Sequence, residues 1–170
     1  MVPEIKKILY ATDLSDNARH VFSYAAAIAN RFNAQIILLH AIEPFSMYAQ
    51  EQLSQMLGES KWSELQISKE HKIVELIQER LNRFCEDMGS SLQECPFLVS
   101  DIVVKRGNAA ELILEECKIH NCDMIVMGTH GHSSFVGALM GSTARRVIRR
   151  STRVPVMVAH LPEDEAGPKG

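Results

Sequence analysis

Short apolar runs alternate with amphipathic segments along most of the chain. The apolar runs are continuous, which is typical of strands that are covered on both faces. Buried strands of this kind occur in parallel sheets with helices on both sides. The runs predict five strands, within residues 5–11, 36–40, 97–105, 124–127 and 154–158.

Between these runs, apolar residues recur at three- and four-residue steps, which predicts helices. We expect Ser15 to cap the first helix, and Asn33 suits the left-handed position that ends it. Asn108 and Glu111 form a pattern like a capping box ahead of a later helix. The helices are predicted within residues 15–32, 61–88, 108–121 and 142–151.

Strands and helices therefore alternate, interrupted by residues 43–60, which break the pattern and are long for a connection. This alternation predicts an α/β fold: a single doubly wound, five-stranded parallel sheet of the flavodoxin or Rossmann type. We expect the strand order 3-2-1-4-5, which reverses between the first and fourth strands. Ligands of such sheets bind at the carboxyl ends of the strands beside the reversal, where Asp13 and Gly128 both fall.

The stretch from Gly128 to Ser142, GTHGHSSFVGALMGS, lies where the fourth strand passes into the last helix. Its pattern, G-x2-G-x9-G-[ST], is neither a P-loop nor the G-x-G-x-x-G dinucleotide fingerprint. A helix N-terminus offers N–H groups and the positive end of a dipole to an anion. Glycine lets the backbone approach a phosphate closely and permits positive φ. The stretch is a candidate phosphate site, and an ordinary Gly/Ser loop is the alternative.

Composition narrows the classes of partner. The chain has 170 residues, of which 46% are hydrophobic and 23% charged, with a formal net charge of −3. These values are ordinary for one globular domain and imply no general attraction to nucleic acid or membrane. No apolar run has the length of a membrane span, and the N-terminus lacks the apolar core of a signal peptide, so we expect a cytoplasmic protein.

The glycine pattern resembles the nucleotide-binding motif of the universal stress protein family, in the branch that binds ATP. The resemblance runs over residues 3–160. It is carried by KKILYATDLS, LLHAIEP and VKRGNAAELI, and by the closing block DMIVMGTHGHSSFVGALMGSTARRVIRRSTRVPVMVAH. The resemblance implies one universal stress protein domain over 1–160 with the adenine nucleotide α-hydrolase-like fold. The polar remainder, 161–170, is predicted to be a disordered tail.

The resemblance also implies a ligand: ATP, or AMP or ADP, with Mg²⁺ or Mn²⁺ carried by the phosphates. In the ATP-binding branch, the acidic residue after the first strand holds the nucleoside, and the residue ending the second strand meets adenine through its backbone. The glycine loop takes the ribose and phosphates. The segment 43–60 is longer than in many family members, which leaves open what covers the purine. The implied binding set is Ala11, Thr12, Asp13, Ala41, Met127, Gly128, His130, Gly131, Gly141, Ser142 and Thr143.

Other polar residues have plainer interpretations. His130 and His132 lack partners at metal-ligand spacing, so we predict no metal site, and His40 fits a hydrogen-bonded core histidine. The arginines from 145 to 153 suit a solvated helix face or the C-terminal end of a helix. No aromatic residues are interleaved with these arginines, so nucleic acid binding is not expected. No C-x-x-C pair occurs, and we expect buried, reduced thiols at Cys85, Cys95, Cys117 and Cys122.

No catalytic constellation appears in the sequence, because the crevice lacks paired carboxylates and an obvious general base. We therefore expect an ATP-binding regulatory module of the stress response that has an unidentified protein partner. A slow ATPase or nucleotide-dependent transferase is one alternative. A protein-interaction module with a vestigial nucleotide site is another.

The last strand, Val154–Val158, should lie at the edge of the sheet. An uncovered apolar edge is an aggregation hazard, and Pro155 removes only one hydrogen-bond donor from it. Universal stress proteins commonly pair this strand with its copy in a second subunit. The resemblance thus implies a homodimer with an antiparallel, two-fold contact.

Overall fold

The structure is a computed structural model that describes residues 1–88, 98–129 and 140–160. One five-stranded sheet forms its centre, in the order β3-β2-β1-β4-β5, and all neighbouring strands are parallel. The predicted fold class and strand order are confirmed. The strands are β1 (Lys7–Ala11), β2 (Gln35–Ile42), β3 (Val99–Arg106), β4 (Met124–Gly128) and β5 (Val156–Ala159).

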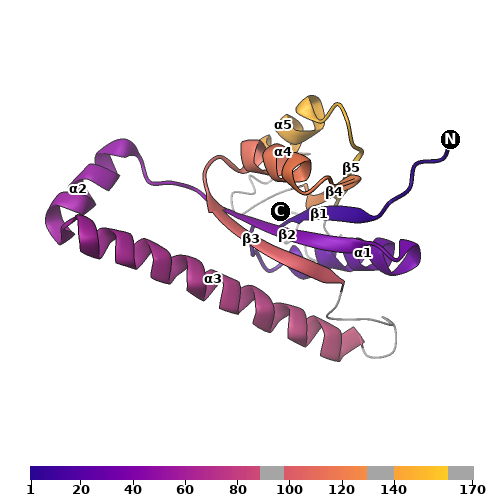
Figure 1. Ribbon diagram of the computed structural model, residues 1–170, viewed down its shortest axis with the longest axis horizontal. Helices are drawn as coiled ribbons and strands as arrows, with labels where there is room; N and C mark the ends of the chain where they lie inside the picture. Colours follow the sequence, from indigo (N-terminus) through magenta and orange to yellow (C-terminus); the bar gives the residue numbers. More distant parts are fainter. Residues whose placement is uncertain (89–97, 130–139, 161–170) are drawn as a thin grey trace, which may run out of the picture.

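Helices cover both faces of the sheet, with α1 and α3 on one side and α4 and α5 on the other (Figure 1). Successive side chains of β1 serve the two sides in turn: Ile8 and Tyr10 pack with α1, and Leu9 packs with α4 and α5. No helix in the described ranges is long and apolar enough to cross a membrane. The helices are α1 (Ala18–Phe32), α2 (Met47–Leu57), α3 (Glu59–Met88), α4 (Ala109–Ile119) and α5 (Ser142–Arg150).

The segment predicted as an irregular connection contains α2 instead. Ser46 caps this helix, since its side-chain oxygen accepts a hydrogen bond from the N–H of Ala49 at 3.2 Å. Gly58, with φ of 82°, ends α2, and α3 begins at the next residue. No residue of α2 is buried, so the sequence lacks the apolar stripe that signals a packed helix. Figure 1 shows α2 and the start of α3 extending beyond the sheet.

Helix ends follow the predictions with one exception. Asn33 has φ of 52° and ψ of 44° at the end of α1, as predicted. Asn108 Oδ1 accepts the N–H of Glu111 at 3.2 Å, so one half of the predicted capping box is present, whereas the Glu111 carboxylate accepts a hydrogen bond from Arg150. Ser15 does not cap α1; Asn17 occupies that position without a side-chain hydrogen bond. The N–H of Ser15 is instead bound by Asp13, which places Ser15 in a turn before the helix.

The edge position of the last strand is confirmed, because β5 pairs only with β4 among the strands of the described residues. It begins two residues later than predicted, at Val156, directly after Pro155. Val156 and Val158 pack on the α4 and α5 side, whereas Met157 packs on the α1 side. The apolar side chains of β5 thus pack in the core. A second chain could pair with the outer backbone edge of β5.

The expectation of reduced cysteines is wrong at one position. Cys117 and Cys122 are free and buried, as predicted, but Cys85 is disulfide-bonded. Cys95 lies outside the described residues. A disulfide requires the two Cβ atoms to lie about 4 Å apart, a tertiary distance that sequence spacing does not reveal.

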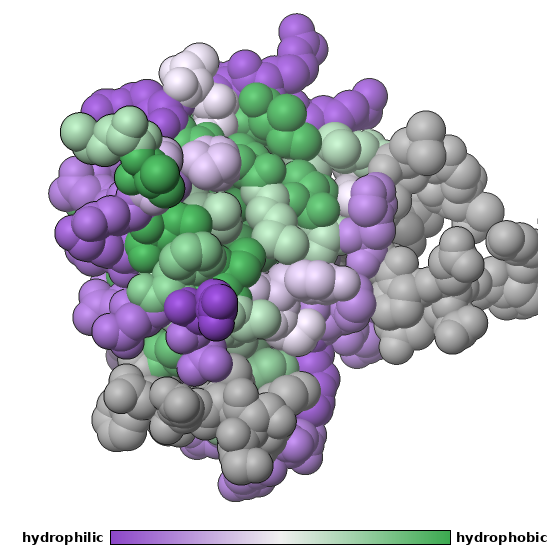
Figure 2. Space-filling model, turned by 90° about the vertical axis from the view of Figure 1, so that its right-hand side faces the viewer, coloured by the Kyte–Doolittle hydropathy of each residue, from purple (hydrophilic) through white to green (hydrophobic). Residues whose placement is uncertain are grey.

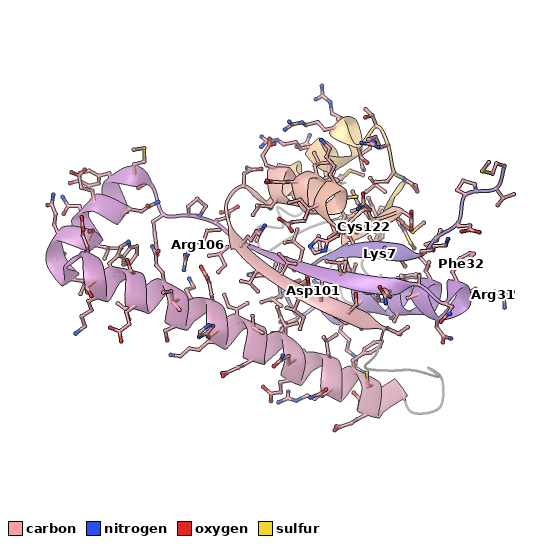
Figure 3. The ribbon with its side chains drawn as sticks, in the orientation of Figure 1. Lys7, Arg31, Phe32, Asp101, Arg106 and Cys122 are labelled. Carbon is pink, nitrogen blue, oxygen red and sulfur yellow. The ribbon has the colours of Figure 1, made fainter. Side chains whose placement is uncertain are left out.

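The end of the molecule where the N-terminus lies carries an apolar surface. Figure 2 shows apolar residues gathered across the middle of this end, with hydrophilic residues around them. Phe32, at the last residue of α1, is 55% exposed there (Figure 3). This end holds the beginnings of the strands, so the surface lies opposite the end where ligands of doubly wound sheets bind.

Candidate functional site

A cavity of about 960 Å³, here called the main cavity, lies at the carboxyl ends of β1, β2 and β4. Its walls are the turn after β1, the end of β2, the end of β4, the first turn of α5 and one side of α3. Sites for small molecules usually measure about 300–1,000 Å³. The cavity therefore has the position and the size expected of a ligand site in this fold.

The predicted site residues that fall in the described part of the chain all line the main cavity. They come from separate segments, which the sheet order brings together beside the β1–β4 neighbour pair. His130 and Gly131 lie outside the described residues. The lining members are Ala11, Thr12, Asp13, Ala41, Met127, Gly128, Gly141, Ser142 and Thr143.

Asp13 sits in a tight turn between β1 and α1. Its Oδ1 accepts the N–H of Ser15 at 3.0 Å, and Thr12 Oγ1 accepts the N–H of Leu14 at 3.1 Å. Leu14 adopts a left-handed backbone with φ of 62°, which is uncommon for a residue of its size. These local bonds shape the turn at the mouth of the cavity.

His40 joins the end of β2 to this turn. Its Nδ1 lies 2.9 Å from the carbonyl oxygen of Thr12, and because a carbonyl only accepts, Nδ1 carries the proton. The side chain is half-buried and lines the main cavity, so it is a hydrogen-bonded histidine, as predicted, but of the cavity wall and not of the core. Ala41 follows it at the end of the strand.

The first turn of α5 points its backbone toward the cavity. Gly141 is the N-cap, and its N–H donates to the carbonyl of the buried Thr129 at 2.7 Å, which fixes the start of the helix against the end of β4. Helix N-termini favour anions, and Ser142, Thr143 and Arg145 add hydroxyl groups and a cation to the lining.

The expected use of positive φ is wrong at Gly141. This residue has φ of −66° and ψ of 161°, an extended conformation open to any residue. Gly128 is the last residue of β4 and also lacks a positive φ. At these two positions, the glycine pattern therefore reflects a missing side chain beside the cavity and not a special backbone angle.

One wall of the main cavity was not predicted at all. It consists of Lys69, Ile73, Leu76 and Arg80, which recur at three- and four-residue steps and so share one side of α3. In the sequence, the signal for this wall is a second stripe beside the buried stripe of α3. Its two cations make it resemble an ordinary solvated helix edge.

One cluster of charged groups is paired away from the cavity. Glu116 is 1% exposed and accepts a hydrogen bond from Lys105, while His120 Nε2 lies 3.3 Å from its other oxygen. The hydrogen bond to Glu116 raises the pKa of Lys105. None of these three residues lines the main cavity. The described residues contain no group of three or more side chains placed to hold a metal ion.

Comparisons with known proteins find matches along most of the chain. The model of the universal stress protein family matches residues 4–160. Universal stress protein MJ0577 of Methanocaldococcus jannaschii is 29% identical over 153 residues, which cover 90% of this chain and 93% of that protein. The solved structure of MJ0577 superposes with a TM-score of 0.68 at 25% identity, covering 94% of this chain and 99% of that one.

A further similarity concerns the fold alone. A universal stress protein solved in complex with cAMP has a TM-score of 0.53 at 22% identity, over 93% of this chain and 98% of that one.

Proposed function

The chain belongs to the universal stress protein family, and from that premise we propose that its main cavity binds ATP. The observation that carries the proposal is convergence. Residues of the glycine motif, the acidic turn and the end of β2 are far apart in the sequence, yet they line one cavity. A chance resemblance would give no reason for the matched positions to share one cavity.

The chemistry of the walls supports one orientation of the proposed ligand. The N-terminus of α5, with Gly141 and Ser142, suits the phosphates, because its N–H groups and dipole favour negative charge. Asp13 suits the ribose, because a carboxylate accepts hydrogen bonds from hydroxyl groups. Ala41 offers its backbone to the base, and Ile73 with Leu76 supplies an apolar surface for the flat ring.

Any divalent metal belongs to the nucleotide in this proposal. Mg²⁺ is commonly held by phosphate oxygens and waters with few protein ligands. We therefore propose that Mg²⁺ or Mn²⁺ arrives with ATP, in keeping with the lack of a ligand cluster in the described ranges.

The proposed physiological role rests on the family and on a cavity whose described lining has no evident catalytic group. We propose a regulatory, stress-responsive module of the cytoplasm. A protein partner would distinguish its nucleotide-bound form from its nucleotide-free form. A homodimer paired through β5 is part of the proposal, since β5 is an edge strand of the sheet that the described residues form. Sedimentation at micromolar concentration tests it: a 19.1 kDa monomer would contradict the dimer.

One experiment tests the central proposal. Protein is purified without added nucleotide, denatured, and the released small molecules are identified by mass spectrometry. We expect an adenine nucleotide in the released fraction, and calorimetric binding of ATP to the emptied protein. Failure to bind any adenine nucleotide would favour the interaction module, and loss of ATP on long incubation would favour a slow ATPase.

A further inference from the structure

The turn that carries Asp13 lies between two cavities. On one side is the main cavity, and on the other is a second, partly open cavity of about 230 Å³, lined by residues of β1, the turn, the start of α1 and α3. Leu14 and Ser15 line both cavities. Atoms next to a void lose contacts on that side, so packing alone holds this turn less firmly than it holds the core.

The turn is also held in an unfavourable conformation. Leu14 has φ of 62°, and an L-residue of this size persists there only when the surroundings impose it. The bonds from Asp13 to Ser15 and from Thr12 to Leu14 lie within the turn itself. They shape the loop, and its start is tied to β2 through the hydrogen bonds of Thr12 with Leu39 and His40.

An anchor comes from α3. Arg80 Nη1 donates to the carbonyl oxygen of Leu14 at 2.8 Å, across 66 positions of sequence. A guanidinium keeps its charge at all ordinary pH values and forms strong hydrogen bonds to carbonyl groups. Arg80 lines both cavities, so it stands where α3 meets the turn.

The position of Arg80 is itself fixed by the part of α3 that packs against the core. Ile77 and Phe84, one turn to either side, are 1% and 4% exposed. The ring of Phe84 packs edge-on against Phe22 of α1, with 4.8 Å between centroids. Through its hydrogen bond to Leu14, Arg80 thus couples the position of this buried helix segment to the position of the turn.

We propose that Arg80 is a positioning residue for the nucleotide: it holds the strained turn at Leu14 so that Asp13 faces the nucleoside. The inference rests on the proposed ATP site and adds that the packing of α3 against the core controls the affinity of that site for the nucleotide. A ligand role for Arg80 makes a different prediction. A guanidinium that touched the phosphates would favour ATP over AMP, whereas one that places Asp13 acts on both nucleotides alike.

The test compares Arg80→Met, which keeps the apolar stem and removes the donors, with Arg80→Lys, which keeps a cationic donor. Arg83→Met is the matched control, because Arg83 lies one turn along and lines only the second cavity. Calorimetry should show ATP and AMP each binding about tenfold more weakly to Arg80→Met. Arg80→Lys should lie between wild type and Arg80→Met, and Arg83→Met should match wild type.

Two further measurements keep the inference separate from the proposed function. Adding Arg80→Met to Asp13→Ala should cost no further ATP affinity, because the turn acts through Asp13. In the nucleotide-free protein, hydrogen exchange at the amides of Leu14 and Ser15 should be faster in Arg80→Met than in Arg83→Met.

The outcomes separate cleanly. A wild type that binds no adenine nucleotide overturns the proposed function, while the exchange measurement still reports on the anchor. Unchanged exchange and unchanged affinity in Arg80→Met overturn the anchor, and a loss confined to ATP makes Arg80 a phosphate ligand instead. If Arg80→Met does not fold, Arg80→Lys carries the same comparisons.

Discussion

The two walls of the main cavity are held in place by different forces. The wall made by β1, β4 and α5 stands on fully buried strands: Ile8, Leu9, Ile125 and Val126 are each 0% exposed. The wall made by α3 belongs to a 30-residue helix in which Ile77 and Phe84 are buried, among the side chains that the structure describes. The first wall is fixed by dense packing, and the second depends on few apolar contacts.

Polar links from arginines supplement that packing along α3. Arg106, at the end of β3, donates to Glu70 at 3.1 Å and to the carbonyl of Gln66 at 3.2 Å (Figure 3). Farther along the helix, Arg80 binds Leu14 and Arg19 binds Asp87. Such links contribute less than a packed core and are easier to rearrange. We call the wall made by β1, β4 and α5 the strand wall and the wall made by α3 the α3 wall. The strand wall should therefore determine which ligand binds, and the α3 wall should modulate the affinity for that ligand.

The largest effect is expected from disturbing the strand wall at Gly141. Gly141→Val places a branched side chain where α5 begins and blocks the approach of phosphate to the helix N-terminus. Losing about two charge-assisted hydrogen bonds, worth roughly 1.5–3 kcal/mol each, should weaken ATP at least about 100-fold. Calorimetry measures this loss, and the thermal midpoint should change little because φ of −66° suits valine.

Gly58→Val is the matched control for that variant. Gly58 joins α2 to α3 with φ of 82° and does not line the main cavity. Valine there strains the backbone, so the melting temperature should fall while ATP affinity stays unchanged. The opposite pattern, with affinity lost at Gly58 and kept at Gly141, would contradict the assignment of the phosphates to α5.

The next effect concerns the nucleoside. Asp13→Ala should weaken ATP by roughly 10- to 150-fold, the range of about 1.5–3 kcal/mol for a hydrogen bond to a charged group. Inorganic triphosphate, which lacks the ribose, should bind as it does to wild type. Asp16→Ala serves as the control, since Asp16 lines only the second cavity. Equal losses of ATP and triphosphate would remove Asp13 from the nucleoside end of the site.

The strand wall was predictable from the sequence for a physical reason. Strands buried on both faces must be continuously apolar, and parallel strands with short links permit few orders, so Asp13 and Gly128 could be placed together. The residues that match the motif are consecutive or nearly so at each strand end. Their convergence then follows from the sheet order alone.

The α3 wall could not be predicted in the same way. Lys69 and Arg80 lie on a helix side whose partner is a cavity, and cations at helical spacing look identical on a solvated surface. The anchoring of Leu14 by Arg80 is a tertiary contact without a local pattern. The glycine motif likewise did not reveal whether the missing side chain or the tolerance of positive φ matters at each position. The prediction of positive φ was wrong at Gly141.

A smaller effect is expected from loosening α3 at its other link. Arg106→Met removes the contacts to Glu70 and Gln66 from a side chain that is 20% exposed. Urea unfolding should show a loss of about 1 kcal/mol, and ATP should bind about two- to threefold more weakly. Arg83→Met, which breaks an exposed pair with Glu79, should leave the free energy of unfolding nearly unchanged. Equal stability of both variants would show that Arg106 does not hold α3.

The smallest effect tests the direction of the ligand between the two walls. Lys69 of α3 and Arg145 of α5 are both cations of the main cavity lining, but they stand on opposite walls. With the phosphates at α5, Lys69→Met removes a charge from the nucleoside end, so ATP and AMP should each weaken by about threefold or less. Arg145→Met should weaken ATP more than AMP, and added salt should reduce that difference because exposed charges are screened. If Lys69→Met instead penalised ATP alone, the phosphates would point toward α3 and the orientation proposed for the nucleotide would be reversed.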